Sequence, residues 1–417
     1  MTEYSSPLLQ RPGAVADSGD DAGLAAHYGD PTKEQRTLDR GRAAVDLSNR
    51  SVVTVTGPDR LSWLTTLSSQ KVDGLKPGES SELLLLDISG RIEHDAVITD
   101  DGETAWLITE NTHGGVLAEW LDAMKFMLRV EITDRTDDYA VLGSVQPLPE
   151  ELPDAVSAAA RWEDPWPQLG PGAASYAAVE ETGHPGADWS WHLTVIPRES
   201  LAAVVEGLEA QDWTLAGTFA AEALRVAAWR PRLAREVDEK AIPHELDLIR
   251  TAVHLSKGCY KGQETVARVH NLGHPPRRLV FLHLDGSEHT LPAVGAEVLA
   301  PKEPTADAEA LAAERAVGVV TSAVRHHEMG PIALALVKRR VDPEAGLVVR
   351  DAVASAAEPQ EGAEEASAEG LAEEAPAPTF YAAAQELIVR PDAGKTVGRP
   401  QGDFVRAPRR PSGTGTR

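Results

Sequence analysis

The chain has 417 residues, of which 42% are hydrophobic and only one is cysteine. This length and composition are those of a folded protein with room for two or three domains. A single cysteine excludes an internal disulfide, a CxxC redox pair and any all-cysteine metal site within one chain. The formal net charge of −25 opposes binding to a nucleic-acid backbone, so we expect no direct nucleic-acid binding.

The amino-terminal residues carry no targeting or membrane signal. Residues 1–6 lack both the basic and the apolar region of a signal peptide. No run of about 18 uncharged apolar residues occurs, so no transmembrane helix is predicted. We therefore expect a soluble, cytoplasmic protein without membrane contact. Residues 1–35 begin with a stretch rich in Ser, Gly, Pro and Asp, which predicts a flexible amino-terminal extension.

Residues 36–276 combine strand and helix patterns. The expected strands are apolar or β-branched runs ended by turn residues, at 51–56, 83–86, 96–99, 105–108, 128–132, 139–142 and 191–196. The expected helices have apolar residues spaced by three and four, at 59–67, 117–128, 201–208 and 218–229. Because the strands are grouped between helices rather than alternating strictly with them, the pattern favours an α+β fold over a doubly wound sheet.

The pattern of predicted secondary structure changes in residues 277–390, where short strands recur without helices. These strands are expected at 279–284, 296–299, 317–324, 332–337, 347–350 and 381–389, and they predict a small carboxy-terminal β-barrel. Residues 352–379 are rich in Ala, Glu and Pro and too poor in large apolar residues to hold a core, so they predict a disordered acidic insertion. Residues 391–417 are predicted to form a basic, flexible tail.

The only cysteine lies in residues 257–264, Lys-Gly-Cys-Tyr-Lys-Gly-Gln-Glu. The two glycines indicate unusual backbone conformations or a close approach to another group. The ammonium groups of Lys257 and Lys261 would favour the thiolate of Cys259 over its ordinary pKa of about 8.5. The β-branched run at 265–269 predicts a strand directly after the motif. The alternative is a structural cysteine buried in a glycine-rich turn, since free cysteines are among the most buried residues.

Other catalytic patterns are missing from the sequence. It contains no GxGxxG, Walker A, GxSxG or HExxH motif. His326 and His327 are adjacent, and adjacent side chains on a strand point to opposite faces, so we interpret them as part of a solvated turn and expect no metal site. The polar residues around Cys259 instead suit an anionic or polar heteroaromatic ligand. They are His254, Lys257, Lys261, Gln263, Glu264, Arg268 and His270.

The motif at 257–264 resembles the signature Lys-Gly-Cys-Tyr-x-Gly-Gln-Glu of the YgfZ family of folate-binding proteins, which are relatives of the glycine-cleavage T-protein, an aminomethyltransferase. Further similarity covers most of residues 46–390. Residues 46–50 and 55–60 resemble an amino-terminal motif that the two groups share. Residues 86–95, which end at Asp95, resemble the segment in which aminomethyltransferases carry their catalytic aspartate.

Residues 224–228, Leu-Arg-Val-Ala-Ala, resemble the segment in which those enzymes place a glutamate against the pterin ring, but Ala227 stands at the acidic position. A carboxylate there would accept two hydrogen bonds from the pterin, and an alanine cannot. An asparagine typical of the enzymes has only an ambiguous counterpart at Glu110 and Asn111. The loss of this glutamate, together with the gain of the cysteine motif, argues against a glycine-cleavage enzyme.

The resemblance implies α/β folate-binding subdomains followed by a β-barrel, with tetrahydrofolate or a related folate as the cofactor in a central channel. It also implies a role in assembling or repairing iron–sulfur clusters, with iron–sulfur enzymes (including tRNA-modifying ones) or cluster-assembly proteins as partners. Cys259 would be the reactive thiol, assisted by Lys257 and Lys261. The expected folate contacts are Asp95, Arg225, Tyr260, Gln263, Glu264 and Arg268. Two alternatives are a folate-dependent aminomethyltransferase or demethylase, and a non-catalytic interaction protein with a vestigial folate cleft.

Overall fold

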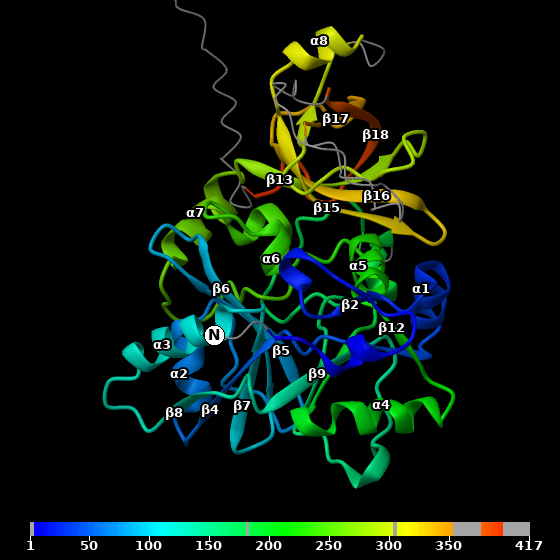
Figure 1. Ribbon diagram of the computed structural model, residues 1–417. Helices are drawn as coiled ribbons and strands as arrows, with labels where there is room; N and C mark the ends of the chain where they lie inside the picture. Colours follow the sequence, from blue (N-terminus) through cyan, green and yellow to red (C-terminus); the bar gives the residue numbers. More distant parts are fainter. Residues whose placement is uncertain (1–3, 181–182, 303–306, 353–376, 395–417) are drawn as a thin grey trace, which may run out of the picture.

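The computed structural model describes residues 4–180, 183–302, 307–352 and 377–394. Two five-stranded sheets and their helices form a body, and a closed β-barrel sits at one end of it (Figure 1). The predicted α+β class with a carboxy-terminal barrel is confirmed. Within the described residues, no helix combines the length and the apolarity that crossing a membrane requires.

The first sheet contains the early and the late strands of the body. Its order is β10 (Ala160–Glu163), β11 (His192–Pro197), β9 (Tyr139–Ser144), β3 (Ala43–Asp46) and β12 (Thr214–Ala216). Only the β12–β3 pair is parallel. The helices α1 (Pro31–Asp39), α4 (Leu201–Glu209) and α5 (Thr218–Ala227) accompany this sheet. The apolar face of α4, with Leu201, Val204, Val205 and Leu208, is buried with this sheet as its spacing predicts.

The second sheet is antiparallel throughout. Its order is β5 (Ser80–Leu86), β6 (Ile92–Asp100), β7 (Thr104–Thr109), β4 (Ser51–Thr56) and β8 (Glu131–Asp134). The helices α2 (Arg60–Leu67) and α3 (His113–Met124) share its core, to which they contribute Trp63, Leu64, Leu117 and Leu121. Asp101 and Gly102 lie in the turn that joins β6 to β7.

The barrel has six strands. Their order is β13 (Arg277–Leu284), β16 (Gly330–Lys338), β15 (Gly318–His326), β14 (Glu297–Leu299), β17 (Leu347–Asp351) and β18 (Thr379–Leu387). Alternate residues of β13 belong to different cores: Val280 and Leu282 to the barrel interior, Leu279 and Phe281 to the core shared with the body. The expectation that this part lacks helices is wrong, because α8 (Ala308–Ala313) lies between β14 and β15.

The prediction of a flexible extension over residues 1–35 is wrong for the described residues from 4 onward. They include the paired strands β1 (Val15–Ala16) and β2 (Ala25–His27), and the side chains of Leu8 and Leu24 are buried. The buried carboxylate of Asp21 pairs with Arg232. Composition alone misled the prediction, because a polar segment can be held by a few apolar anchors and by charges from distant parts of the chain.

The strand predicted at 265–269 is also wrong, because these residues belong to the helix α7 (Gln263–Leu272). The β-branched side chains that suggested a strand express only a weak preference, which context overrides. Arg268 Nη2 lies 2.7 Å from Glu264 Oε1, and a salt bridge between residues four apart in the chain is typical of a helix.

Most of the predicted insertion at 352–379 and of the predicted tail at 391–417 lies outside the described residues.

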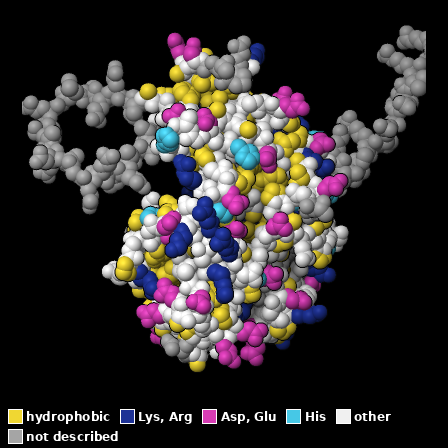
Figure 2. All heavy atoms as spheres, turned by 90° about the vertical axis from the view of Figure 1, so that its right-hand side faces the viewer, with side chains coloured by type: hydrophobic (Ala, Val, Ile, Leu, Met, Phe, Trp, Pro, Cys, Tyr) yellow, Lys and Arg dark blue, Asp and Glu magenta, His cyan; other side chains and the backbone are white. Residues whose placement is uncertain are grey.

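The surface charge is uneven in spite of the acidic total. Figure 2 shows Lys and Arg side chains gathered on the face of the molecule that carries α1. In and just after α1, the side chains of Lys33, Arg36, Arg40 and Arg42 are exposed. Contact with an anionic partner is therefore electrostatically more favourable on this face than on the acidic remainder of the surface.

Candidate functional site

A cavity lies where the two sheets meet α5. It contains about 840 Å³ of space free of protein atoms, part of which is open solvent. Both sheets contribute to it, since Asp95 comes from β6 and Trp162 from β10, while Glu222 and Arg225 come from α5. Its apolar walls include Leu47, Ile108, Trp162, Trp189, Trp191 and Leu193.

Three tryptophans give the cavity flat aromatic walls. The rings of Trp189 and Trp191 are stacked, with centroids 5.5 Å apart and an angle of 17° between the planes. Trp162 Nε1 donates to the carbonyl of Ser81 at 2.8 Å, and Trp189 Nε1 donates to Asp164 Oδ2 at 2.9 Å. Because these two N–H groups are already paired within the protein, the indoles of Trp162 and Trp189 offer mainly their ring surfaces to a ligand.

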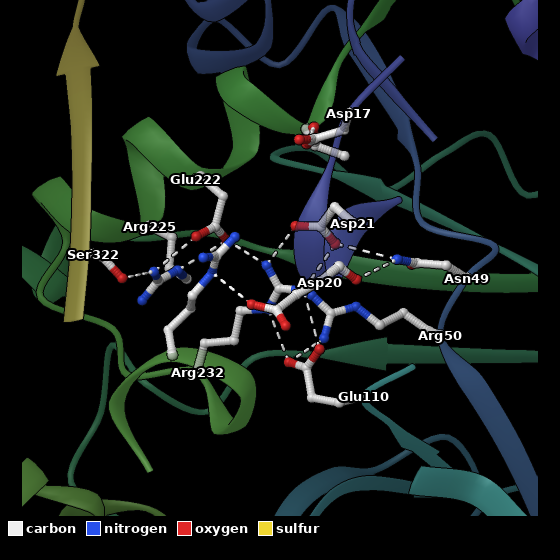
Figure 3. Close-up of polar contacts among 12 residues, drawn as sticks. Asp17, Asp20, Asp21, Asn49, Arg50, Glu110, Glu222, Arg225, Arg232 and Ser322 are labelled. Atoms are coloured by element: carbon white, nitrogen blue, oxygen red, sulfur yellow. Dashed lines mark hydrogen bonds and ion pairs between the residues drawn. The ribbon is translucent and has the colours of Figure 1, made fainter. Parts of the chain in front are cut away.

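A network of buried charges closes one side of the cavity (Figure 3). Arg232 lies at its centre and donates to both oxygens of Asp21, at 2.7 and 2.8 Å, and to both of Glu110, at 2.9 and 3.0 Å. Glu222 accepts from Arg232 at 3.1 Å and from Arg225 at 2.8 Å. Burial alone would raise the pKa of Glu110, but Arg232 and Arg50 together lower it to about 2. These carboxylates are therefore ionised and held in fixed positions.

A second arginine organises the other polar wall. Arg230 Nη2 donates to Glu82 Oε1 at 2.7 Å, and its Nε donates to Asp164 Oδ2 at 3.0 Å. The hydroxyl of Thr251 donates to the second oxygen of Glu82 at 2.7 Å. Glu82 and Asp164 are thus committed to partners within the protein.

Asp95 is the exception among the acids of the cavity. Its side chain is half-buried, and its Oδ1 is buried with no hydrogen-bond partner in the described part of the chain. Burial, and then the neighbouring charge of Glu82, raise the pKa of Asp95 well above that of an ordinary aspartate. Asp95 therefore keeps its proton to a higher pH than an ordinary aspartate does and can donate or accept a hydrogen bond.

The structure brings two of the nine predicted site residues to this cavity, Asp95 and Arg225. Arg225 is fully engaged, since it pairs with Glu222 and Glu236 and donates to Ser322 Oγ at 2.8 Å, so it positions the carboxylates beside the cavity. The other seven predicted residues do not line the cavity, and their roles stay predictions. They are Lys257, Cys259, Tyr260, Lys261, Gln263, Glu264 and Arg268.

Residues 257–262 of the motif form a turn before α7, and Gln263 and Glu264 are the first two residues of that helix. Cys259 is exposed, so the alternative of a buried structural cysteine is wrong. Lys257 Nζ donates to the carbonyls of Thr65 and Ser68, and it lies 4.7 Å from the ring centroid of Tyr260. Burial lowers the pKa of Lys257 to about 8. Lys261 Nζ pairs with Glu93 at 2.8 Å. The contacts of both ammonium groups are thus with groups other than the thiol.

Gly262 fixes this turn against the one at residues 87–91. Its φ of +84° is left-handed, and an added Cβ would lie 2.5 Å from the carbonyl oxygen of Asp87. We expect Gly262→Ala to lower the free energy of unfolding by at least about 1 kcal/mol, because both the conformation and the contact oppose a side chain. The matched control is Gly258→Ala, where an added Cβ has open space around it. Urea denaturation of the two variants checks the prediction, and equal midpoints would contradict it.

Most charged residues of the cavity were missed by sequence reasoning. Among the six acids and four arginines that line it, only Asp95 and Arg225 were predicted. One signal was available, because Glu82 directly precedes four leucines and shares a face of that strand with Leu84 and Leu86, and a buried acid requires a partner. Asp21 and Arg232 gave no such signal, since each lies in a locally polar segment.

Among the described residues, no three or more His, Cys, Asp or Glu side chains are grouped so that they could hold a metal ion. His326 ends β15, and His327 lies in the turn that follows, with the ring centroids 4.5 Å apart. The turn contains His327 only, and the interpretation as solvated residues is wrong, because His326 is buried and the side chain of His327 is only 4% exposed.

The sequence and the fold of this chain are similar to those of known proteins. Residues 24–257, more than half of the chain, match the GCV_T family, described as the GCVT N-terminal domain. The aminomethyltransferase of Streptomyces coelicolor is 25% identical over 325 residues, which cover 75% of this chain and 83% of the relative. The aminomethyltransferase of Cupriavidus taiwanensis is 26% identical over 262 residues, which cover 58% of this chain and 69% of the relative.

Among solved structures, the glycine cleavage system aminomethyltransferase T from Bartonella henselae superposes with a TM-score of 0.62 and 17% identity, covering 82% of this chain and 91% of that one. At this identity the likeness establishes the fold alone. The predicted relationship to the glycine-cleavage T-protein is confirmed at the level of the family, and membership of the YgfZ subgroup stays a prediction. The chain therefore belongs to the GCV_T family and has an aminomethyltransferase-like fold with a closed six-stranded β-barrel at its carboxy-terminal end.

Proposed function

We propose that the protein binds tetrahydrofolate in the cavity and supports the assembly or repair of iron–sulfur clusters in other enzymes, including tRNA-modifying ones. The observation that carries folate binding is the carboxyl of Asp95, whose Oδ1 has no hydrogen-bond partner among the described residues, in a cavity that tryptophans also line and in a fold shared with aminomethyltransferases. The iron–sulfur role is supported by the resemblance of residues 257–264 to the YgfZ signature and by the exposure of Cys259.

The cavity suits the chemistry of a reduced pterin. A pterin is a flat ring whose edge carries an amino group and ring N–H donors, and such a ring matches the indole surfaces of Trp189 and Trp191. Carboxyl groups are acceptors for those donors, and Asp95 has free hydrogen-bonding capacity in the described structure. When bound, tetrahydrofolate would supply a carrier for one-carbon units, while Asp95 would orient it and hold a proton beside it.

Binding is tested by titrating the full-length protein with tetrahydrofolate while recording tryptophan fluorescence. Three tryptophans line the cavity, so a ligand between them should change the emission in a saturable way. The absence of any saturable change up to about 1 mM, which corresponds to a binding free energy weaker than about 4 kcal/mol, would contradict the proposal. That result would favour the interaction protein with a vestigial cleft.

Cys259 would act at the outer surface. Because it is exposed and does not line the cavity, its thiol suits contact with another macromolecule better than reaction with an enclosed ligand. One thiol cannot hold an iron–sulfur cluster by itself, so any cluster contact would be shared with a partner.

For Cys259→Ala we expect unchanged tetrahydrofolate affinity and an unchanged urea midpoint, because the side chain is exposed and does not line the cavity. In cells that depend on this protein, the activity of iron–sulfur enzymes should fall to the level of the deletion strain. Ser256→Ala, three residues earlier, is the control and should retain full activity. Normal activity of the enzymes in the Cys259→Ala strain would refute a role for the thiol.

A folate-dependent aminomethyltransferase or demethylase is the second candidate. It is favoured by Asp95, whose raised pKa and free hydrogen-bonding capacity suit a proton-transferring group. It is opposed by Ala227, which ends α5 where the resemblance places an acid. Formation of methylenetetrahydrofolate from an aminomethyl-loaded lipoyl carrier or from a methylated amine would establish this activity.

A further inference from the structure

Arg230, in the wall of the cavity, has a donor nitrogen that the folded chain does not use. Its Nη2 donates to Glu82 and its Nε to Asp164, but its Nη1 is buried and has no hydrogen-bond partner in the described part of the chain. Arg230 lines the cavity, and only 6% of its surface is exposed. A buried donor without an acceptor is costly, so this nitrogen calls for a partner from outside the chain.

Two acids and an aromatic ring fix the guanidinium of Arg230. Glu82 lies on β5 and Asp164 directly follows β10, so both sheets hold the group. Its central carbon lies 5.0 Å from the ring centroid of the fully buried Trp166, in a cation–π contact. The position of Nη1 is thus set before a ligand arrives, which lowers the entropic cost of binding to it.

The charge of Arg230 is already balanced by carboxylates. Its Nη2 lies 2.7 Å from Glu82 Oε1, and its Nε lies 3.0 Å from Asp164 Oδ2. An anionic ligand would bring a third negative charge close to these two carboxylates, which would repel it. A carbonyl oxygen accepts a hydrogen bond without adding a charge. The free Nη1 of Arg230 therefore suits a neutral oxo group better than an anion.

Asp95 lies close to this donor and lines the same cavity. Burial and then Glu82 raise the pKa of Asp95, and the positive charge of Arg230 opposes this rise, as expected for neighbouring groups. Arg230 nevertheless forms its ion pairs with Glu82 and Asp164. Within the described residues, Asp95 Oδ1 and Arg230 Nη1 are both without a hydrogen-bond partner. A ligand edge that carries an N–H group beside an oxo group would satisfy both atoms.

From this arrangement we infer that Arg230 determines which pteridine ring the cavity accepts: its Nη1 donates to the 4-oxo oxygen of the pterin, while Asp95 accepts from the adjacent N3–H. The inference rests on the proposed folate binding and specifies which edge of the ring is recognised. In a 4-amino analogue, an amino donor replaces the oxo acceptor, and the adjacent ring nitrogen has no hydrogen. The pattern of donor and acceptor is thus reversed, so the cavity should select 4-oxo over 4-amino folates.

The test is anaerobic calorimetric titration of the full-length protein with tetrahydrofolate and with 4-amino-4-deoxytetrahydrofolate, which differ only at this edge of the ring. We expect the wild type to bind tetrahydrofolate at least about tenfold more tightly, because the amino compound leaves Nη1 of Arg230 without an acceptor. Equal affinities, or tighter binding of the amino compound, would overturn the inference and leave folate binding intact. Binding of neither compound at about 1 mM would overturn the folate proposal and this inference with it.

The variant Arg230→Lys separates recognition from a structural role. Lysine keeps a positive charge for Glu82 and Asp164 but lacks the planar guanidinium that places Nη1. We expect the ratio of the two affinities to fall to within about threefold of one, mainly because tetrahydrofolate binds more weakly. If both affinities fall by the same factor, the ratio stays unchanged, and Arg230 has a structural role only.

The matched control is Arg60→Lys. Arg60 donates to both oxygens of Asp100, at 2.7 and 2.8 Å, and it does not line the cavity. This variant should keep the wild-type ratio of affinities, and a changed ratio would show that the ratio does not report on the cavity wall. Circular dichroism shows whether Arg230→Lys folds. If it does not fold, the comparison of the two compounds on the wild type decides the inference.

Discussion

Replacing Arg232 with methionine is expected to lower the free energy of unfolding by about 3–5 kcal/mol, the cost of breaking a buried ion pair from one side. The substitution would leave the carboxylates of Asp21, Glu110 and Glu222 close together without their shared cation. The methionine would fill much of the same space, so the loss reflects charge rather than a cavity. Urea denaturation followed by circular dichroism measures the effect.

The pH dependence of this loss has a defined sign. The folded-state pKa of Glu110, about 2, is below its ordinary value, so the ion pairs of Glu110 contribute stability above about pH 4.5, and this contribution disappears as the pH falls toward 2. In Arg232→Met the stability should therefore depend less on pH over this interval than in the wild type.

The control for Arg232→Met is Arg129→Met, which removes an exposed arginine paired with Asp59 and should leave the urea midpoint unchanged. Equal losses in the two variants would show that the buried network does not hold the body together. A measured loss that persists unchanged at pH 2 would show that it arises from packing and not from charge.

Asp95→Asn is expected to weaken tetrahydrofolate binding about tenfold or more, because a hydrogen bond to a charged or proton-donating carboxyl is worth roughly 1.5–3 kcal/mol. Asparagine has nearly the same shape, so the walls of the cavity should not move. The fluorescence titration of wild type and variant measures the ratio of the affinities.

The same substitution should stabilise the protein without ligand. The pKa of Asp95 is raised in the folded state, whereas in the unfolded chain Asp95 ionises at about pH 4. The wild type therefore loses stability as the pH rises from about 4 to the folded-state pKa of Asp95. Asparagine does not titrate, so the variant should be more stable than the wild type at neutral pH and equally stable in acid. This combination of weaker binding and higher stability is typical of a functional group and not of a structural one.

Asp101→Asn is the opposite control. Burial alone would raise the pKa of Asp101, but hydrogen bonds from Trp106 Nε1 and from backbone N–H groups lower it. Neutralising Asp101 should therefore lower the free energy of unfolding and leave folate affinity unchanged. If Asp95→Asn binds tetrahydrofolate as tightly as the wild type does, Asp95 is not a folate contact, and the assignment of the cavity must be revised.

Local sequence patterns were sufficient to predict most helices and strands. Strands such as β4, β7 and β16 and the helix α4 follow from runs and spacings of apolar residues, because burial on one or both faces imposes those periods. The same reasoning failed for α7, where β-branched residues lie in a helix that buries little more than Val266. A helix that buries few side chains does not need apolar residues at helical spacing, so its sequence does not distinguish it from a strand.

The sequence by itself determined the α+β class, the carboxy-terminal barrel and the relationship to the aminomethyltransferases. It also singled out Asp95, which the structure places in the wall of the cavity. Only the tertiary structure decided which charges meet around that cavity. Asp21 and Arg232 are 211 residues apart, and no local period connects them. The structure likewise decided that Cys259 lies outside the cavity and that Arg278 is buried with no counter-charge among the described residues. Periodicity records which side of an element is buried, whereas the pairing of charges depends on how distant elements pack against one another.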